Sequence, residues 1–215
     1  KEYIEYKYFD AIDGNTISKN TNIIKQNSSN YSNGALGCAL SHLRLWNKCI
    51  ELNKPIVIME DDVFVSKDFN KHIENVIKML PSSWHILQLS FNCDSILSYS
   101  NMNFEDSICF FTKNKFNDKD IESFQNSTIY PTVAKLKMAF GTGCYSITPE
   151  GAKVLKQMCF PLDNRIINIP LIGEIKAFSI DCMLNDIYKK INAYVCPIPF
   201  AMTKHLYVNY ESTIN

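Results

Sequence analysis

Apolar residues recur every three to four positions over residues 35–53, which predicts an amphipathic helix. The residues on its apolar face are Leu36, Ala39, Leu40, Leu43, Trp46 and Ile50. Pro55 follows, and because the residue before a proline avoids the helical conformation, the chain becomes extended here. The next four residues, "IVIM" at 56–59, form a short, continuous apolar run. Such a run is typical of a strand buried on both faces of a parallel sheet.

A second helix and a second strand follow. Helical spacing of apolar residues returns over 69–80, with Ser66 or Asp68 as the N-cap and Pro81 as the stop signal. Residues 84–90, "WHILQLS", then predict another strand. The order is therefore helix, strand, helix, strand, which predicts a parallel α/β sheet with helices on its faces.

The segments on either side of this alternation are less regular. The opening of the chain has strand character up to Phe9 and a turn signal at Asp13 and Gly14. Residues 15–33 are rich in Asn and Ser and are predicted to form a loop. Residues 91–132 show no periodicity, so we expect an insertion that shapes the substrate site and carries its own short hairpin.

Regular patterns return in the last third of the chain. Two strands are predicted on either side of the segment 141–143, "GTG". A helix is expected to open at Thr148, with Pro149 at its first position. A final helix is predicted over 180–190, followed by a short strand within 193–200.

Composition and charge exclude some classes of protein. Hydrophobic residues make up 46% of the chain, and 22 basic residues balance 22 acidic ones. This balance argues against a nucleic-acid partner, since nucleic-acid-binding proteins usually carry a basic surface. No apolar run reaches about 18 residues, so we expect no transmembrane helix. No signal peptide is visible at the start.

The cysteines predict unpaired thiols rather than a zinc site or a disulfide framework. None of the eight forms a CxxC pair, and their neighbours are mostly apolar. Buried free thiols in a reducing compartment fit this pattern.

Three consecutive acids, Glu60, Asp61 and Asp62, follow the predicted strand at 56–59. In open α/β sheets, ligands bind beyond the carboxyl ends of the strands. Side chains alternate along a strand, so Glu60 and Asp62 are expected to point the same way, where two carboxylates can share a hard cation. Such a cation could bridge to a diphosphate. The alternative is a solvated turn with one acid capping the next helix.

Several blocks of this sequence resemble glycosyltransferase family 25, the lipopolysaccharide and lipooligosaccharide glycosyltransferases related to the collagen hydroxylysine galactosyltransferases. The most specific block, residues 34–69, reads "GALGCALSHLRLWNKCIELNKPIVIMEDDVFVSKDF". The further blocks are "FDAIDG" (9–14), "WHILQLS" (84–90), "GTGCYSITPEGAKVL" (141–155), "SIDCMLNDIY" (179–188) and "PFAMTKHLYVNYESTI" (199–214).

The sequence departs from the family pattern at two points. Ala35 stands where family members often have Glu, which puts the role of that acid in doubt for this chain. The first strand of the family, which reads like "VINL", does not precede the "FDAIDG" turn. We therefore expect a single family domain over 1–215 that lacks this strand and has its acceptor-side insertion at 91–132.

The resemblance implies a GT-A-like, Rossmann-type fold, a mostly parallel sheet flanked by helices, and transfer of a sugar from a UDP-sugar. Galactose is the expected sugar, a lipooligosaccharide or lipopolysaccharide hydroxyl the acceptor, and inversion the stereochemical outcome. Mn²⁺ or Mg²⁺ is expected on Asp62, with Glu60 or Asp61 helping and His205 as a third ligand. The cation would neutralise the leaving diphosphate.

Donor contacts are assigned to Glu60, Asp61, His42, Gly143 and Asp10. His42 lies in the half of its helix that faces the ligand crevice, although Ser41 could take this role or His42 could simply pack. Gly143, like Gly141, could let the backbone approach a sugar closely, or it could only make a turn. Asp10 belongs to the early turn of the family pattern.

The general base that inversion requires is assigned to Asp181, which opens the predicted helix over 180–190 within a matching family block. The plain alternative for Asp181 is a first-turn acid that complements the helix dipole. Asp186 is a weaker candidate, and Glu174 and Asp163 remain open. His72 and His85 are expected to be structural.

Other functions stay open at this point. The same fold could serve a glucosyltransferase or a protein hydroxylysine galactosyltransferase, and a non-catalytic nucleotide-sugar-binding module is a different class. A metal-dependent hydrolase would usually need more histidines than the four present. A lipid-linked acceptor would place the protein in the cytoplasm, with peripheral association at the inner membrane.

Overall fold

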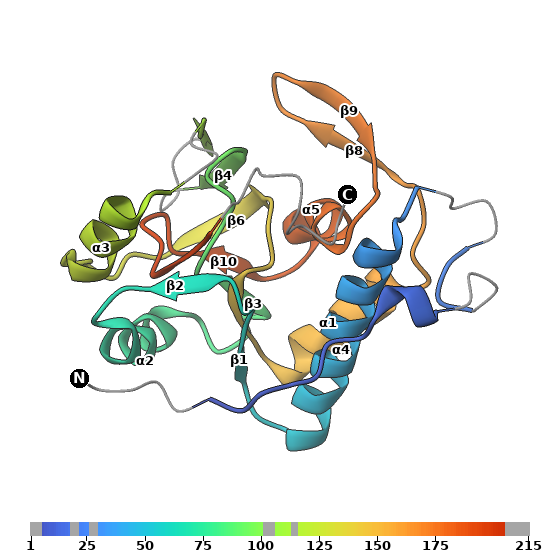
Figure 1. The fold of residues 1–215 in the computed structure, drawn as a ribbon, viewed down its shortest axis with the longest axis horizontal. Helices are drawn as coiled ribbons and strands as arrows, with labels where there is room; N and C mark the ends of the chain where they lie inside the picture. The colour runs from blue at the N-terminus through green and yellow to red at the C-terminus, as the bar shows by residue number, and fades with distance from the viewer. Residues whose placement is uncertain (1–5, 18–21, 26–29, 101–105, 113–115, 205–215) are drawn as a thin grey trace.

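A seven-stranded sheet with helices on both faces forms the body of the protein (Figure 1). The structure is a computed structural model of the 215-residue chain. It describes residues 6–17, 22–25, 30–100, 106–112 and 116–204. The α/β class and the flanking helices agree with the prediction from the sequence.

The strands of the main sheet lie in the order β1 (Ile56–Met59), β7 (Cys144–Ile147), β3 (Ile86–Gln88), β10 (Ala193–Val195), β6 (Ala134–Ala139), β4 (Ile96–Ser100) and β5 (Asp106–Phe110). Two smaller sheets pair β2 (Val63–Val65) with β11 (Ala201–Thr203), and β8 (Ile166–Ile169) with β9 (Gly173–Lys176). The helices are α1 (Asn33–Leu52), α2 (Phe69–Met79), α3 (Asp118–Asn126), α4 (Pro149–Cys159) and α5 (Ile180–Ile187), with short 3₁₀ turns η1 (Gly14–Thr16) and η2 (Tyr188–Lys190).

The expectation of a mostly parallel sheet is wrong. Within the described main sheet, only β3 and β10 are neighbours that run parallel, and every other neighbouring pair is antiparallel. The strands β1 and β3 do run in the same direction, as the helix–strand alternation predicts. However, β7 lies between them and is antiparallel to both. Local patterns predict the order of elements along the chain, but not which distant strand comes to lie between two others.

Strand β1 lies at one edge of the described sheet, and one of its faces is largely exposed. Its one partner in that sheet is β7, and its burial alternates along the strand. Val57 is 41% exposed and Met59 is 37% exposed, whereas Ile58 is buried. A short apolar run cannot distinguish a central strand from an edge strand, because this difference depends on the neighbours.

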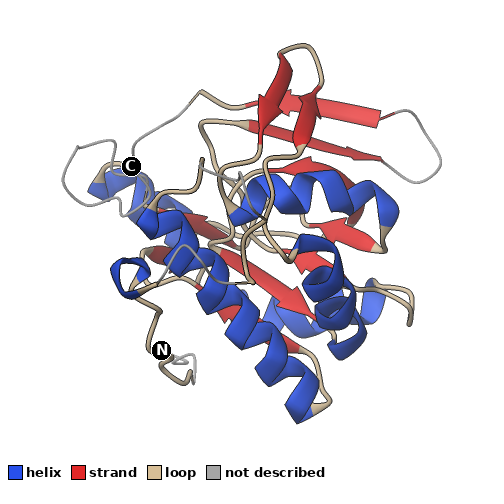
Figure 2. Ribbon diagram, turned by 90° about the vertical axis from the view of Figure 1, so that its right-hand side faces the viewer, coloured by secondary structure: helices blue, strands red, loops and turns tan. Residues whose placement is uncertain are grey.

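Two hydrophobic cores lie on opposite faces of the sheet. Ile86 in β3 packs into the core that α1, α4 and α5 cover. The next residue, Leu87, contributes to a second core with α2. This division follows from the alternation of side chains along a strand. Figure 2 views the molecule from the side that carries α1 and α4, with the strands behind them.

The starts of α1 and α4 follow capping signals, whereas Asp68 precedes α2 without a side-chain capping bond. Ser32 caps α1 by accepting the backbone N–H of Ala35, and Asn53 ends it in the left-handed conformation. The predicted start of α4 is confirmed, because Thr148 accepts the N–H of Gly151 and Pro149 is the first helical residue.

Two segments differ from their predictions. The stretch 91–132 contains a hairpin, as expected, but its strands β4 and β5 extend the main sheet and α3 follows them. It is therefore less irregular than its sequence indicates. Residues 6–9 form no strand, so the opening strand is wrong for the described part of that segment.

The thiols agree with the prediction. All eight cysteines are free, six of them are buried, and Cys38 and Cys109 are half-buried. Among the helices that the structure describes, none is long and apolar enough to cross a membrane.

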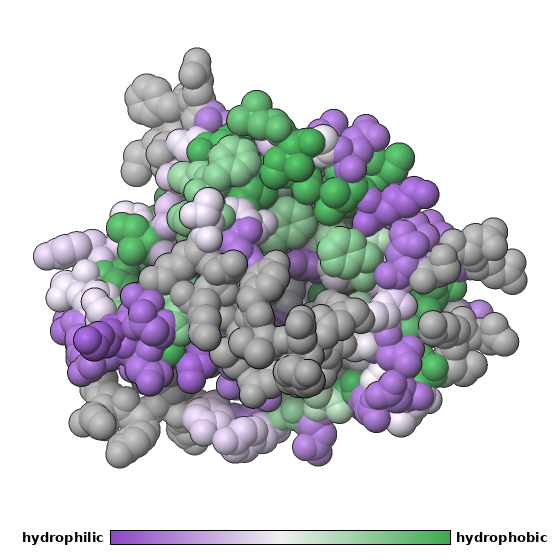
Figure 3. Space-filling model, turned by 45° about the horizontal axis from the view of Figure 1, so that its top comes forward, coloured by the Kyte–Doolittle hydropathy of each residue, from purple (hydrophilic) through white to green (hydrophobic). Residues whose placement is uncertain are grey.

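The β8–β9 hairpin exposes large apolar side chains. Ile166 is 58% exposed, Leu171 is 86% exposed and Ile172 is 63% exposed. The hairpin projects from the top of the molecule in Figure 1, and Figure 3 shows apolar surface at the same end.

An ion-pair cluster joins the segment after α4 to α5. Arg165 Nε lies 2.8 Å from Asp163 Oδ1, and its Nη1 lies 3.0 Å from Asp186 Oδ2. Lys25 Nζ lies 2.7 Å from Asp163 Oδ2. Burial would raise the pKa of Asp163, but hydrogen bonds and ion pairs with Arg165 and Lys25 outweigh it and hold this pKa at about 2.

The variant Asp163→Asn is expected to lower the free energy of unfolding by roughly 1–2 kcal/mol at pH 7. Because the folded-state pKa lies below the unfolded-state value, this contribution is present above about pH 4 and is lost as pH falls toward 2. Urea unfolding at pH 7 and near pH 2 measures the free energy of unfolding of the variant and of wild type. The difference between them should be smaller at the lower pH, and the exposed Asp10→Asn is the control. A difference that is constant with pH would contradict the ion-pair explanation.

Candidate active site

The three acids lie in a tight turn between β1 and β2. The N–H of Val63 donates to the carbonyl of Glu60 at 3.4 Å, which closes the turn. The N–H of Glu60 donates to the carbonyl of Gly143 at 2.8 Å, at the start of β7. The N–H of Lys204 donates to the carbonyl of Asp62 at 3.0 Å. The turn is therefore held from two sides by segments far away in the sequence.

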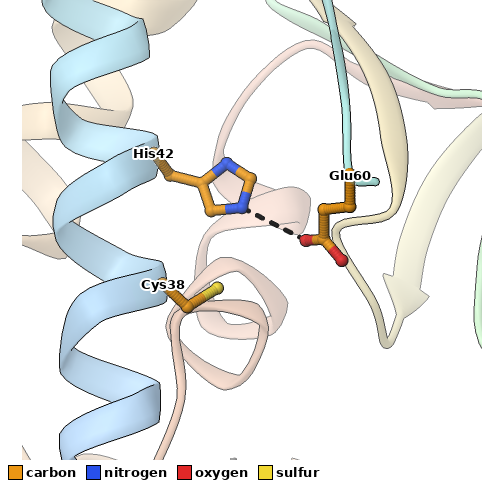
Figure 4. Close-up of side chains that lie close together, drawn as sticks. All are labelled: Cys38, His42 and Glu60. Atoms are coloured by element: carbon orange, nitrogen blue, oxygen red, sulfur yellow. Dashed lines mark hydrogen bonds and ion pairs between the residues drawn. The ribbon is translucent and has the colours of Figure 1, made fainter. Parts of the chain in front are cut away.

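The carboxylate of Glu60 accepts hydrogen bonds from two directions. The hydroxyl of Thr142 donates to its Oε1 at 2.6 Å. His42 Nε2 lies 3.3 Å from the same oxygen, as Figure 4 shows. The side chain of Glu60 is 34% exposed. One part of it therefore faces solvent, and the other part lies between α1 and the segment before β7.

His42 continues this network into the core. Its Nδ1 lies 2.8 Å from the hydroxyl of Tyr145, which also accepts the indole N–H of Trp46 at 2.8 Å. Burial opposes the charged imidazole, but Tyr145, Cys38 and Glu60 raise the pKa of His42 well above its usual range. His42 is thus a buried side chain with a polar partner at each ring nitrogen.

Cys38 lies one helical turn before His42 and points toward the same space (Figure 4). One ligand atom each from Cys38, His42 and Glu60 lies within 4.8 Å of the other two. The sulfur, nitrogen and oxygen donors of this group would suit a borderline-soft ion such as Zn²⁺ better than Mn²⁺ or Mg²⁺.

Asp61 and Asp62 differ from Glu60 because both are exposed. Partial desolvation, together with the charges of Glu60 and Asp61, raises the pKa of Asp62 to about 6 although its side chain reaches solvent. The chain turns at 61–62, so the alternation expected for a continuing strand does not apply here. Carboxylate oxygens crowded into one turn are the donor set that Mn²⁺ or Mg²⁺ prefers.

Asp181, the predicted general base, lies in the first turn of α5. Its Oδ2 accepts the N–H of Gly141 at 3.0 Å, and its Oδ1 accepts the N–H of Cys182 at 2.8 Å and the hydroxyl of Ser179. Through Gly141 it holds the segment that carries Thr142. Its role as a base stays a prediction.

The other predicted residues are scattered around this site. Ser41 accepts the N–H of Ile12 and donates to the carbonyl of Gly37, so it serves packing. Asp10 is exposed. The backbone at Gly143 closely approaches protein side chains, because an added Cβ would lie 2.7 Å from Thr203 Oγ1. The predicted ligand His205 lies outside the described residues.

The weaker base candidates are placed elsewhere. Asp163 and Asp186 both pair with Arg165, which satisfies their charges. Glu174 is exposed on β9. Among the candidates for the general base, Asp181 is therefore the one that is hydrogen-bonded to the segment 141–143.

Sequence reasoning missed Thr142, Tyr145 and Trp46 as parts of the site. Trp46 stands on the apolar face of its helix and Tyr145 in a strand, so both patterns indicate core residues. Their polar atoms matter because they meet each other across 99 residues of chain. Thr142 could have been found from its position between two glycines.

Gly141 has φ of +93°, and a Cβ there would lie 2.2 Å from Asn92 Oδ1. The variant Gly141→Ala is therefore expected to lose roughly 1–3 kcal/mol of stability from backbone strain, and more from crowding. Gly173→Ala is the matched control, because Gly173 has φ of +120° and no atom within 4 Å of an added Cβ. Equal losses in thermal unfolding of the two variants would contradict the crowding argument.

A mixed sheet flanked by helices, with a carboxylate turn at the carboxyl end of β1, is consistent with a GT-A-like nucleotide-sugar transferase fold. Residues 1–166 match the family model described as "Glycosyltransferase family 25 (LPS biosynthesis protein)". The chain belongs to glycosyltransferase family 25.

A curated relative supports this membership. The chain is 27% identical over 164 residues to a Haemophilus influenzae (strain ATCC 51907 / DSM 11121 / KW20 / Rd) protein described as "Putative glycosyltransferase". The match covers 74% of this chain and 49% of the relative, so the chain spans about half the length of that protein.

Proposed function

We propose that this protein is a metal-assisted, inverting glycosyltransferase that moves a sugar from a UDP-sugar to a hydroxyl of a lipooligosaccharide or lipopolysaccharide acceptor. Galactose is the sugar that we propose. The family membership supports the reaction class. The observation that carries the proposal is the turn of Glu60, Asp61 and Asp62 at the carboxyl end of β1, the position at which α/β sheets bind ligands.

The acid turn fits a hard divalent cation. Asp62 is proposed as the main ligand, and its exposed side chain and that of Asp61 are open to an incoming ion. When bound, Mn²⁺ or Mg²⁺ would supply positive charge for the leaving diphosphate. His205 follows Lys204, whose N–H bonds the carbonyl of Asp62, and it is kept as a proposed third ligand.

Inversion needs one base at the acceptor hydroxyl, and we propose Asp181 for it. In that step the acceptor oxygen bonds to the anomeric carbon, UDP leaves with the electrons of the broken bond, and Asp181 takes the hydroxyl proton. Asp181 would exchange one of its present hydrogen bonds for that hydroxyl. We propose that Glu60 contacts the donor's ribose or sugar hydroxyls, and Asp61, Asp10 and Gly143 are kept as further proposed donor contacts.

The acceptor side is proposed from surface chemistry. A glycolipid acceptor would bring the protein to a membrane surface, and the exposed apolar side chains of the β8–β9 hairpin would suit contact with it. Peripheral association at the inner membrane from the cytoplasmic side is therefore part of the proposal.

The test is release of UDP from a panel of UDP-sugars, with and without Mn²⁺, in the presence of truncated lipooligosaccharide acceptors. UDP-galactose with Mn²⁺ is expected to give the fastest turnover, and the anomeric configuration of the product is read by NMR. Turnover with UDP-glucose and with no other UDP-sugar would contradict galactose as the transferred sugar. No turnover with any donor, measured on the full-length protein, would refute the transferase function.

A further inference from the structure

We propose that Tyr145 and Trp46 are positioning residues that act through His42 to hold Glu60 as a hydrogen-bond acceptor for a hydroxyl of the sugar-nucleotide donor. None of them needs to contact the donor. The proposal deepens the proposed function, on which it rests. It also divides the three acids, because Glu60 is then held for donor hydroxyls while Asp62 remains for the cation.

The directions of the hydrogen bonds follow from the chemistry of their end groups. The indole nitrogen of Trp46 only donates, and an ionised Glu60 only accepts. His42 Nε2 must therefore carry a proton toward Glu60, whether the ring is neutral or charged. At the other end, the hydroxyl of Tyr145 accepts from Trp46 and pairs with His42 Nδ1. With a neutral ring, the hydroxyl of Tyr145 donates to Nδ1, and the bonds run in one direction from the core to the acid turn. With a charged ring, this hydroxyl accepts from both Trp46 and His42, and Nε2 still donates to Glu60.

Burial makes this chain stiff. Tyr145 and Trp46 are fully buried and His42 is 3% exposed, so their polar atoms have no solvent to exchange with. In such surroundings a hydrogen-bond network fixes ring orientations, because every alternative leaves a buried polar group unpaired. Only Glu60, at the end of the network, is partly open to solvent.

A second support reaches Glu60 from the opposite side. Thr142 donates to the same oxygen as His42, and Asp181 anchors the preceding residue through the N–H of Gly141. The carboxylate is therefore held by the helix α1 and by the segment before β7. Such preorganisation is what a binding residue requires to select one arrangement of donor hydroxyls.

A metal ion on Cys38, His42 and Glu60 is the competing explanation of the same cluster. It would need the lone pair of His42 Nε2, which the proposed network instead protonates toward Glu60. The two arrangements are therefore mutually exclusive at one atom. This makes them separable by experiment without any substrate.

The first experiment is ¹⁵N NMR of His42 in the intact protein, combined with titration by Co²⁺. The proposal requires Nε2 to bear a proton, and it requires Co²⁺ to produce no thiolate-to-metal absorption band. A protonless Nε2, or a Co²⁺ band that Cys38→Ser removes and Cys109→Ser retains, would overturn it. Neither measurement depends on the transferase reaction, so its failure is distinguishable from failure of the proposed function.

The second experiment uses Tyr145→Phe, with the exposed Tyr130→Phe as its control. Loss of one positioning hydrogen bond is expected to raise the KM for the donor about tenfold, with a smaller change in kcat and an unchanged Mn²⁺ requirement. Trp46→Phe, which keeps an aromatic ring and removes the N–H, should shift the KM in the same direction. Unchanged donor KM in both folded variants would overturn the positioning role.

Discussion

Replacing Asp62 by alanine is expected to lower kcat about a hundredfold or more and to remove stimulation by Mn²⁺. A cation that neutralises a leaving diphosphate contributes several kcal/mol to transition-state stabilisation, and each 1.4 kcal/mol is about tenfold in rate. Asp62 is the acid that we assign to this cation. Initial rates of UDP release over a range of Mn²⁺ concentrations measure the effect.

The same variant should not lose stability when no cation is present. The pKa of Asp62 is raised to about 6 in the folded protein, above its unfolded value. The metal-free wild type therefore loses stability as pH rises from about 4 to about 6, and Asp62→Ala should lack this loss. Glu74→Ala on the outer face of α2 is the control for both measurements. Unchanged activity and unchanged Mn²⁺ dependence in Asp62→Ala would show that the metal assignment is wrong.

Replacing Gly37 by alanine is expected to destabilise the protein by roughly 1–3 kcal/mol or more, although alanine is the better helix former by about 1 kcal/mol. Gly37 lies inside α1, where the turn at 9–14 packs its backbone against the helix. An added Cβ would lie 2.4 Å from the carbonyl oxygen of Ile12 and 2.8 Å from the nitrogen of Gly14. These are backbone atoms, so the crowding cannot be relieved by a side-chain rotation.

Ser41→Ala separates crowding from hydrogen bonding at this contact. This variant adds no volume, but it removes the hydroxyl that accepts the N–H of Ile12 at 2.9 Å. Leaving that N–H unpaired is expected to lower the free energy of unfolding by about 1–3 kcal/mol. Urea unfolding of both variants and the double variant gives the coupling energy. A gain in stability for Gly37→Ala would mean that the turn does not pack closely on α1.

These contacts explain part of the sequence resemblance in physical terms. The "FDAIDG" turn and the "GALGC" start of α1 carry glycines because one backbone lies directly on the other. An added Cβ at Gly14 would lie only 1.6 Å from the carbonyl oxygen of Asn33. The two motifs are therefore complementary surfaces of a single contact.

The sequence by itself determined the helices α1, α2, α4 and α5, several strands and the place of the three acids at the end of a strand. These depend on signals within a few residues: apolar spacing, the Thr148 cap, and the prolines that end elements. The free thiols were also predictable, since none of the cysteines has the close spacing of a metal or redox pair. Family membership was readable from one dense block.

Only the tertiary structure decided how these elements meet. It placed β7 between β1 and β3, which made the sheet mixed rather than mostly parallel, and it left β1 at an edge of the described sheet. It also brought Thr142 to Glu60 across 82 residues of chain and His42 to Tyr145 across 103. Side-chain chemistry is local, but hydrogen bonds between distant segments depend on packing. For that reason the acids could be recognised from the sequence, whereas the network that holds Glu60 could not.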